Sequence, residues 1–358
     1  MNDPELQLYP LEMSLHRIRR SWGGWPGKVG EIWSLSGPPH ESIVLNGALA
    51  GQLLTKIVGT FQQRLLGPGV ELDPREPFPI FLKFISTRED LPLQVHPNDP
   101  YTLRKGLPMV GRDKIWYILK AGAGARVYLG FREEEDKAAV LEAIREKRLR
   151  RSINAVPVRG GEAFSIPPGR VHAAGRGVIL AEIQRHSHLT FELTSGAGEG
   201  RKRAPEGLEP EEALEVMNLQ PLAPKAIEMI SVLAEGGSIE YLALTPRFLI
   251  RRLKVRDALD ISFPGKQLAV YTGLKGTGWL KWGFSNTSCY LQPFQSVIVP
   301  AVEQELFFET DEGLEVLETS LSDLGGGTVQ QILHSGIALG RVADLGGEDY
   351  CRIIKTCL

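Results

Sequence analysis

The sequence has few cysteines, no long apolar run and no excess of either charge. Its three cysteines are Cys289, Cys351 and Cys357, and none forms a CxxC pair. This pattern indicates neither a disulfide framework nor a thiolate zinc site, and it is typical of a reducing compartment. No stretch reaches the roughly 18 apolar residues of a spanning helix, and residues 1–20 lack the apolar segment of a secretory signal. We therefore expect a cytoplasmic protein that does not enter membranes.

The balance between acidic and basic residues restricts the classes of partner that we expect the protein to bind. The chain has 358 residues, with 41 Lys and Arg against 43 Asp and Glu, and a formal net charge of −2. Without a basic excess, we expect no binding to nucleic acid through phosphate neutralisation. A hydrophobic content of 42% and a charged content of 23% indicate a globular protein with a sizeable core. At roughly 150 residues per domain, the length predicts two domains.

Short apolar runs separated by glycine and proline predict a mainly β protein. With 39 Gly and 24 Pro between them, the runs favour a barrel or sandwich of antiparallel strands over alternating βαβ units. Helices are predicted at 47–66, capped by Asn46, at 133–150 and at 209–217. The predicted strands are 78–85, 91–96, 114–121, 125–131, 178–184, 248–255, 269–274, 278–283 and 296–301.

A linker near residue 219 divides two strand-rich blocks. The two blocks share a weakly similar pattern, a turn followed by an apolar strand and a proline, in GEAFSIPPG and QPFQSVIVPA. We predict an N-terminal domain at 1–218 that carries the site and a second domain at 219–320. Residues 321–358 contain LGGG and LGG and are predicted to be an appended, partly flexible extension.

Two short motifs carry candidate metal ligands. Gln94 and His96 stand two apart on a predicted strand, so their side chains leave the same face, and His172 follows a tight PPGR turn. Imidazole nitrogen and amide oxygen suit zinc or a similar divalent ion. Taken singly, each histidine fits equally well as an ordinary buried or surface residue.

Together with their surroundings, these motifs resemble the class I phosphomannose isomerases, zinc enzymes of the cupin superfamily. The resemblance covers roughly residues 8–320 and implies two double-stranded β-helix (jelly-roll) domains with inserted helices. It also implies interconversion of mannose 6-phosphate and fructose 6-phosphate through an enediol, with a sugar phosphate as substrate. The resembling segments are Trp22-Gly23-Gly24, GEIWSLSG, SIVLNGALAG, FPIFLKFI, LQVHPND, WYIL, GEAFSIPPGRVHA and AEIQ.

The resemblance assigns three metal ligands in this chain, and a lysine stands at the position of the fourth. Gln94, His96 and His172 match the family's ligands, but Lys114 stands where the family has a glutamate. A protonated ammonium does not ligate a dication, so binding of a divalent metal is predicted to be weak. Asp113, one residue out of phase, is an alternative ligand if a strand bulge turns it inward.

The resemblance also assigns substrate and proton-transfer roles. Lys83 and Glu182 match positions used in substrate handling and proton transfer, and Lys83 and Arg170 are the candidate substrate-binding residues. The alternatives are a surface lysine at 83 and an exposed strand carboxylate at 182. Pro92 and Glu192 depart from the family, which has a serine and an arginine there.

The site keeps some of the family's residues and has others replaced, and this combination is consistent with two functions. One is a mannose-6-phosphate isomerase with Glu182 as acid and base, and the other is a metal-poor relative that binds a sugar phosphate without turnover. Lys114 either takes the place of the dication or turns away to pair with an acid such as Glu182 or Glu192. The basic run 147–151 is interpreted as a solvated helix end rather than a polyanion site.

Overall fold

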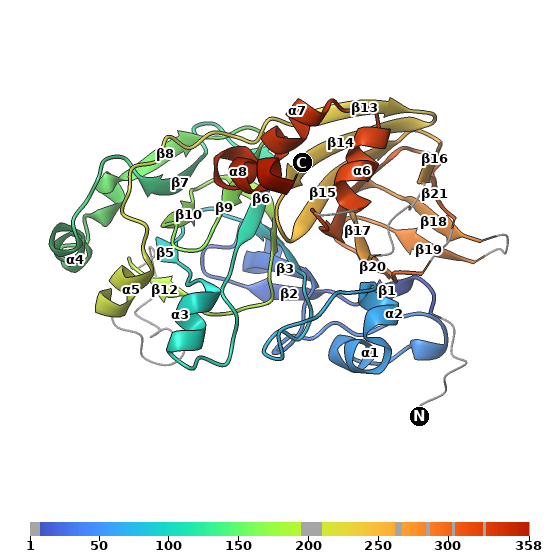
Figure 1. Cartoon of the computed structure of the whole chain (residues 1–358), viewed down its shortest axis with the longest axis horizontal. Helices are drawn as coiled ribbons and strands as arrows, with labels where there is room; N and C mark the ends of the chain where they lie inside the picture. The colour runs from blue at the N-terminus through green and yellow to red at the C-terminus, as the bar shows by residue number, and fades with distance from the viewer. Residues whose placement is uncertain are drawn as a thin grey trace. The chain divides into compact units, whose positions relative to one another are not determined.

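The chain forms two compact units, each built from two sheets (Figure 1). The computed structural model describes residues 8–194, 210–261, 267–283, 287–302, 305–324 and 327–357. Unit 1 combines the described parts of 1–16, 34–72 and 227–358, and unit 2 those of 17–33 and 73–226. This grouping is not contiguous in sequence, and the division into 1–218, 219–320 and 321–358 stays a prediction.

Unit 2 contains a six-stranded sheet and a five-stranded antiparallel sheet. Apolar side chains from the two sheets share one buried core, which includes Ile118, Leu129 and Leu180. In spatial order the six strands are β2 (His16–Arg19), β3 (Val29–Leu35), β4 (Phe81–Ser86), β11 (Val178–Gln184), β6 (Lys114–Ala121) and β9 (Ala163–Ile166). The five are β12 (Phe191–Glu192), β5 (Gln94–Val95), β10 (His172–Ala174), β7 (Arg126–Phe131) and β8 (Ile153–Pro157).

Helices cover the outer side of the five-stranded sheet. Val140 and Leu214 pack with Val95, Phe131 and Ala173 in a second buried cluster. The amphipathic pattern of these helices places that apolar stripe against the sheet. The helices of unit 2 are α3 (Asp99–Arg104), α4 (Lys137–Arg145) and α5 (Pro210–Val216), with 3-10 turns η1 (Pro26–Lys28) and η3 (Leu149–Ser152).

Unit 1 repeats the two-sheet plan with a core that includes Leu253, Tyr271, Leu280 and Phe308. Its seven-stranded sheet runs β1 (Leu11–Met13), β20 (Ser296–Val299), β17 (Ala269–Gly276), β22 (Leu314–Leu321), β15 (Phe248–Val255), β14 (Gly237–Leu244) and β13 (Ile230–Ala234). Its four-stranded sheet runs β16 (Ala258–Ile261), β21 (Leu306–Glu309), β18 (Gly278–Trp282) and β19 (Ser288–Leu291). The predicted mainly β architecture with inserted helices is confirmed.

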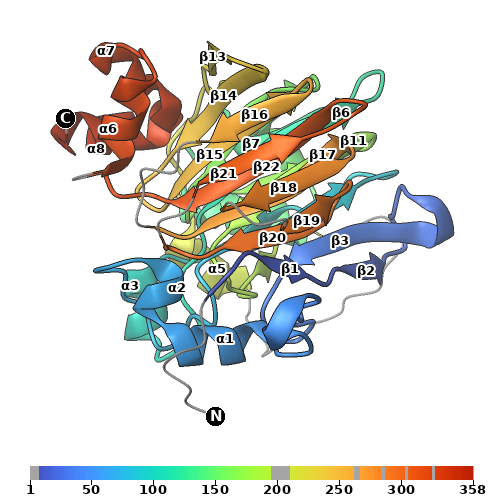
Figure 2. The same cartoon turned by 90° about the vertical axis from the view of Figure 1, so that its right-hand side faces the viewer.

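The last segment of the chain is packed rather than loose. Figure 2 shows its helices gathered beside β13, β14 and β15. Ile332, Leu345 and Ile354 are fully buried against Tyr241 and Leu249 of that sheet, which contradicts the predicted partly flexible extension. The helices of unit 1 are α1 (Leu54–Phe61), α2 (Gln63–Leu66), α6 (Gly327–His334), α7 (Leu339–Val342) and α8 (Gly347–Cys357), with 3-10 turns η2 (Gly47–Leu49) and η4 (Ala343–Gly346).

Two predicted helices are shorter than expected. The segment 47–66 breaks at Gln62, whose φ of 42° ends α1. Asn46 does not cap this segment, because its amide instead accepts a hydrogen bond from the Glu12 backbone and donates one to the Pro10 carbonyl. In 133–150 the helix begins after Asp136, whose carboxylate accepts from the Ala139 backbone.

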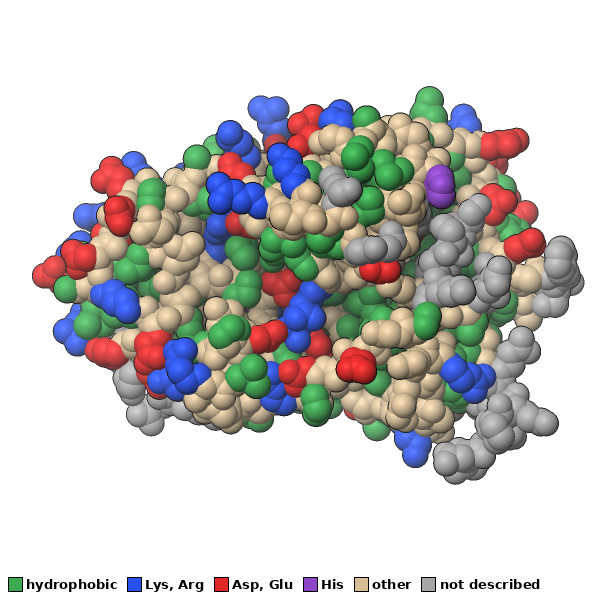
Figure 3. Space-filling view, viewed as in Figure 1, with side chains coloured by type: hydrophobic (Ala, Val, Ile, Leu, Met, Phe, Trp, Pro, Cys, Tyr) green, Lys and Arg blue, Asp and Glu red, His purple; other side chains and the backbone are tan. Residues whose placement is uncertain are grey.

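The described surface carries mixed charge. In Figure 3, Lys and Arg side chains lie among Asp and Glu side chains over the visible face, as the balanced composition predicts. Within the described ranges, no helix has both the length and the apolar character needed to cross a membrane.

Candidate active site

Glu182 lies at the centre of a buried charged cluster in unit 2. Strand β11 pairs with β4 and β6, and this register places Glu182 opposite Lys83 on one side and Trp116 on the other. One carboxylate oxygen accepts hydrogen bonds from Lys114 Nζ at 2.9 Å and from the Trp116 indole N–H at 2.6 Å. The other oxygen lies 3.1 Å from Lys83 Nζ. With 1% of its side chain exposed, Glu182 is not the exposed strand carboxylate of the alternative interpretation.

The cluster continues through Lys83 to a second carboxylate. Lys83 Nζ lies 3.9 Å from Glu31, which accepts a hydrogen bond from the Trp33 indole at 2.6 Å. Arg20, at the outer end, lies 3.3 Å from Glu31. Because its side chain is only 13% exposed, Lys83 is not a surface lysine, and it bridges two buried carboxylates.

Burial and charge act in opposite directions on these groups. Burial raises the pKa of Glu182, but the ammonium groups of Lys114 and Lys83 and the Trp116 hydrogen bond outweigh burial and hold this pKa well below its usual range. Burial, together with the charges of Arg112 and Lys83, lowers the pKa of Lys114 to about 7, although the attraction of Glu182 opposes this shift. At neutral pH the carboxylate is therefore ionised, while Lys114 exchanges its proton within the physiological range.

His96 and His172 are brought together, with ring centroids 4.9 Å apart. Each Nδ1 lies within hydrogen-bond distance of a backbone carbonyl, at 2.9 Å from Leu189 for His96 and at 2.7 Å from Arg170 for His172. Because a carbonyl only accepts, Nδ1 carries the proton and Nε2 carries a lone pair. Both Nε2 atoms are buried and have no hydrogen-bond partner among the described residues.

Both imidazoles are held neutral. Burial lowers the pKa of His96 and of His172 well below the usual value, and the nearby charges of Lys114 and Arg112 lower each further. Neutral imidazoles anchored at Nδ1 have the orientation of metal-binding histidines. They also suit hydrogen-bond acceptance from a cation or hydroxyl.

The other predicted residues surround this core. Gln94 is half-buried and pairs directly with His172 across β5 and β10. Arg170 contributes its carbonyl to His172. Asp113 is half-buried, and the only register shift in the β6–β11 pairing of the described strands lies elsewhere, between Ile179 and Leu180. Among the described residues, no group of three His, Cys, Asp or Glu side chains could hold a metal ion, so Asp113 does not complete a ligand set with His96 and His172.

Glu192 does not reach the cluster as the partner of Lys114. It is exposed at the end of β12, opposite Gln94, whereas Lys114 is buried and pairs with Glu182. Of the two predicted alternatives for Lys114, pairing with an acid agrees with this geometry, but the lysine stays inside the unit. Trp116 and Tyr117 are both buried, as predicted for core packing.

Arg112 is a site residue that sequence reasoning missed. Its guanidinium donates to the Leu189 carbonyl at 2.8 Å and to the Thr190 hydroxyl at 2.9 Å. The same carbonyl binds His96, so Arg112 and His96 share one anchor. Burial lowers the pKa of Arg112 to about 10, which still leaves it charged. The sequence shows only that Arg112 and Asp113 are charged residues directly before the strand at 114–121, which does not identify the distant partners of Arg112.

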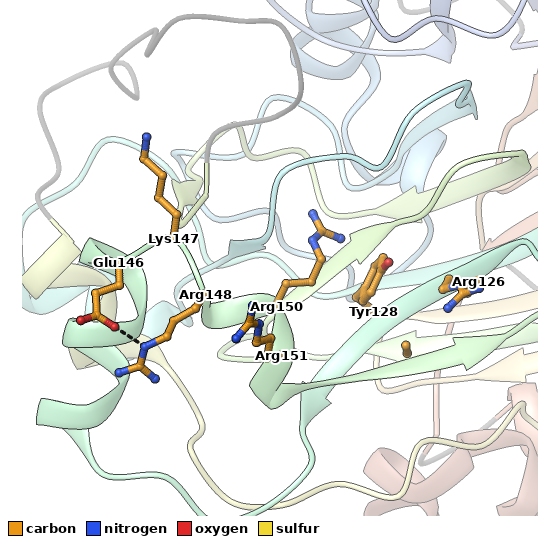
Figure 4. A pocket seen from close by; sticks show the side chains of 8 residues that line it. Arg126, Tyr128, Glu146, Lys147, Arg148, Arg150 and Arg151 are labelled. Atoms are coloured by element: carbon orange, nitrogen blue, oxygen red, sulfur yellow. Dashed lines mark hydrogen bonds and ion pairs between the residues drawn. The ribbon is translucent and has the colours of Figure 1, made fainter.

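A separate hollow of about 590 Å³ lies at the end of α4 (Figure 4). Arg148 there pairs with Glu146 and with Glu142, and Arg150 packs over the Tyr128 ring at 4.2 Å. The residues of the basic run that line the hollow are exposed or half-exposed, in line with the predicted solvated helix end. The lining residues are Arg126, Tyr128, Glu146, Lys147, Arg148, Arg150, Arg151 and Ala155.

Comparison with known proteins decides the family. No family model matches the chain. A protein of Bacillus subtilis named "Probable mannose-6-phosphate isomerase GmuF" is 30% identical over 229 residues, which cover 59% of this chain and 69% of that protein. The chain belongs to the mannose-6-phosphate isomerase family. A mannose-6-phosphate isomerase of Streptococcus mutans is 25% identical over 323 residues, covering 86% of this chain and 97% of the relative.

Solved structures of the mannose-6-phosphate isomerase family share the fold. The mannose 6-phosphate isomerase of Bacillus subtilis superposes with a TM-score of 0.75 at 21% identity, covering 87% of this chain and 99% of that one. A zinc-bound mannose 6-phosphate isomerase gives a TM-score of 0.62 at 13% identity, covering 86% and 98%. The family resemblance predicted from the sequence is confirmed.

Proposed function

We propose that the protein interconverts mannose 6-phosphate and fructose 6-phosphate, with Glu182 as the acid and base. The observation that carries this proposal is the buried Glu182 carboxylate, ionised and held between Lys83 and Lys114 within a member of the mannose-6-phosphate isomerase family. Aldose and ketose phosphates differ by the position of one proton on neighbouring carbons, so the reaction needs a positioned base and a positive group near the developing oxyanion.

The proposed reaction moves one proton from C2 to C1 and shifts a second from the C2 oxygen to the C1 oxygen. In the open-chain sugar, Glu182 takes the proton from C2, and the C–H electron pair becomes the C1–C2 double bond of the enediol. The carbonyl oxygen gains a proton as this bond forms. Glu182 then returns the carbon-bound proton to C1, and the C2 hydroxyl gives its proton back to the group that protonated the carbonyl oxygen, which yields the ketose. The cations Lys83, Lys114 and Arg112 outnumber the buried carboxylates Glu31 and Glu182, and this excess suits an anionic phosphate ester.

A resident zinc ion fits these residues poorly. The two free Nε2 lone pairs of His96 and His172 are suitable donors, and Gln94 could add an amide oxygen. Nevertheless, within the described parts of the chain no three His, Cys, Asp or Glu side chains lie close enough together to hold a metal ion. Lys114, where the resemblance places the fourth ligand, presents an ammonium instead of a carboxylate.

Charge also opposes a dication. The three cations and two carboxylates named above leave an excess of one positive charge. Below the pKa of Lys114 of about 7 this excess is fully present, and it disfavours a dication. The three neutral donors Gln94, His96 and His172 bring no negative charge to offset a dication, and both oxygens of Glu182 already face ammonium groups.

The second candidate function is binding of a sugar phosphate without turnover. It is favoured by the same contacts that hold Glu182, because a carboxylate bound by two ammonium groups and an indole N–H is a weak base. The two functions differ in turnover but share the ligand.

Turnover of mannose 6-phosphate in a coupled assay tests the first proposal. Comparison of the parent with Glu182→Gln, which keeps the size of the side chain and removes the base, should show at least a 1000-fold loss in kcat. The matched control is Glu192→Gln, an exposed carboxylate on β12, which should keep kcat within about twofold. A parent that binds mannose 6-phosphate in calorimetry but shows no turnover supports the second function instead.

A further inference from the structure

We propose that Lys114 replaces the divalent metal as the cationic group of this site, so that the protein works without a resident metal. The inference rests on the proposed sugar-phosphate function and specifies how the site obtains its positive charge. It concerns the one position at which this chain departs from the ligands implied by the family resemblance.

The placement of Lys114 supports a built site rather than an accidental substitution. Lys114 lies at the start of β6 in register with Gln184, and only 1% of its side chain is exposed. Its ammonium donates to Glu182 at 2.9 Å, and the Trp116 indole N–H donates to the same oxygen. A buried lysine without a partner is costly, and here the chain supplies one.

Lys114 also lies near the imidazoles that the family resemblance assigns to the metal. Its Nζ lies 5.9 Å from the centroid of the Trp116 ring, and the His172 ring lies 5.4 Å from that same ring. Among the described residues, neither His96 Nε2 nor His172 Nε2 has a hydrogen-bond partner. An ammonium offers three N–H donors and no acceptor. One donor engages Glu182, which leaves others for an imidazole lone pair or for an oxygen of the ligand.

Replacement of the metal by Lys114 accounts for two features of the site, the orientation of the imidazoles and the positive charge. The imidazoles keep the orientation of metal ligands, because their Nδ1 atoms are bound to backbone carbonyls. Meanwhile the neighbourhood keeps a positive charge of the kind that stabilises an oxyanion. A monovalent ammonium carries less charge than a dication, but it is covalently attached to the protein, so a chelator cannot remove it.

Zinc content provides a readout that does not depend on activity. After dialysis against EDTA and exchange into ZnCl₂, the parent should bind less than 0.1 zinc per chain at micromolar zinc. Lys114→Glu restores the family ligand and should bind close to one zinc per chain, with an upward shift in Tm on adding zinc. The matched control is Lys120→Glu, which adds the same charge at an exposed position of β6 and should behave as the parent does.

Binding of mannose 6-phosphate in EDTA tests the role of the ammonium. Calorimetry at pH 6, where Lys114 with its pKa of about 7 is mostly protonated, should give a Kd at least tenfold weaker for Lys114→Met than for the parent, while Lys120→Met is unchanged. If Lys114→Glu does not fold, the parent zinc content and the Lys114→Met titration still decide the matter.

Several outcomes overturn the inference. They are stoichiometric zinc retained by the parent through EDTA, turnover that EDTA abolishes and zinc restores, and an unchanged Kd in Lys114→Met. Turnover that requires zinc would leave the isomerase function standing and remove the inference. Absence of turnover with or without zinc, combined with the expected zinc contents and Kd values, would remove the isomerase function and leave the inference standing.

Discussion

The protein should become more stable as pH rises from 7 to 10, and Lys114 should be the cause. Burial lowers its pKa from 10.5 in the free side chain to about 7. Between these values the unfolded chain binds a proton that the folded chain does not, so raising the pH favours the folded state. Below about pH 7 both states hold the proton, and the contribution of Lys114 no longer changes.

The magnitude follows from the size of this window. Each pKa unit corresponds to about 1.4 kcal/mol, so between pH 7.5 and 9.5 the free energy of unfolding should rise by about 2.5 kcal/mol on account of Lys114. Glu182 contributes no slope there, because its pKa lies well below the usual range and it stays ionised.

Chemical denaturation of the parent and of Lys114→Met at several pH values in EDTA measures this term. The difference in unfolding free energy between the two proteins should change by about 2.5 kcal/mol from pH 7.5 to 9.5. Lys120→Met, the exposed control on the same strand, should run parallel to the parent. Parallel curves for the parent and Lys114→Met would refute the reasoning, since the lysine would then keep its ordinary pKa in the folded protein.

Three further predictions concern stability. Burial keeps the pKa of His172 well below its usual value, so in the metal-free protein the free energy of unfolding should fall below pH 6.5 by up to about 1.4 kcal/mol per pH unit for this residue, and His172→Gln should show a smaller fall in denaturation series. Trp116→Phe removes the indole N–H that donates to Glu182 and should cost about 1.5–3 kcal/mol in urea unfolding; a change below about 0.5 kcal/mol would contradict this. In unit 1, Arg251 and Glu318 form a buried pair at 2.7 Å. Arg251→Met should therefore destabilise the protein by about 3–5 kcal/mol in calorimetry, and the double variant with Glu318→Leu should recover most of that loss.

The parts of the fold that the sequence predicts best are central strands. The bounds of β6, β11 and β15 coincide with the predicted runs, because apolar residues dominate each run even where cationic residues interrupt it, as in β15. Helix bounds were less predictable. Asn46 was wrongly predicted to cap the helix at 47–66. Its amide instead binds the backbone at Pro10 and Glu12, and the residue spacing within 47–66 does not reveal those contacts.

The site was predictable as a set of residue types but not as a set of contacts. The motifs identify Glu182, Lys83 and His172 because each stands in a recognisable short string. Arg112 and Glu31 were missed, since their roles depend on partners from distant segments. Arg112 acts through a carbonyl at Leu189, and no local pattern encodes such a pairing.

The N-terminal strand β1 completes the seven-stranded sheet of unit 1, whose other strands come from the C-terminal part of the chain. This arrangement affects the order of folding during synthesis. Strand β1 pairs with β20, and the nearby contact between Cys289 and Pro10 spans 279 residues. At about 5–20 residues per second, β1 waits roughly 15 to 55 seconds for its partner to be made. Meanwhile residues 73–226 of unit 2 emerge as one continuous piece. The nascent chain therefore carries an unpaired strand edge for longer than unit 2 needs to leave the ribosome, and this edge is where chaperone binding or mispairing between chains should concentrate.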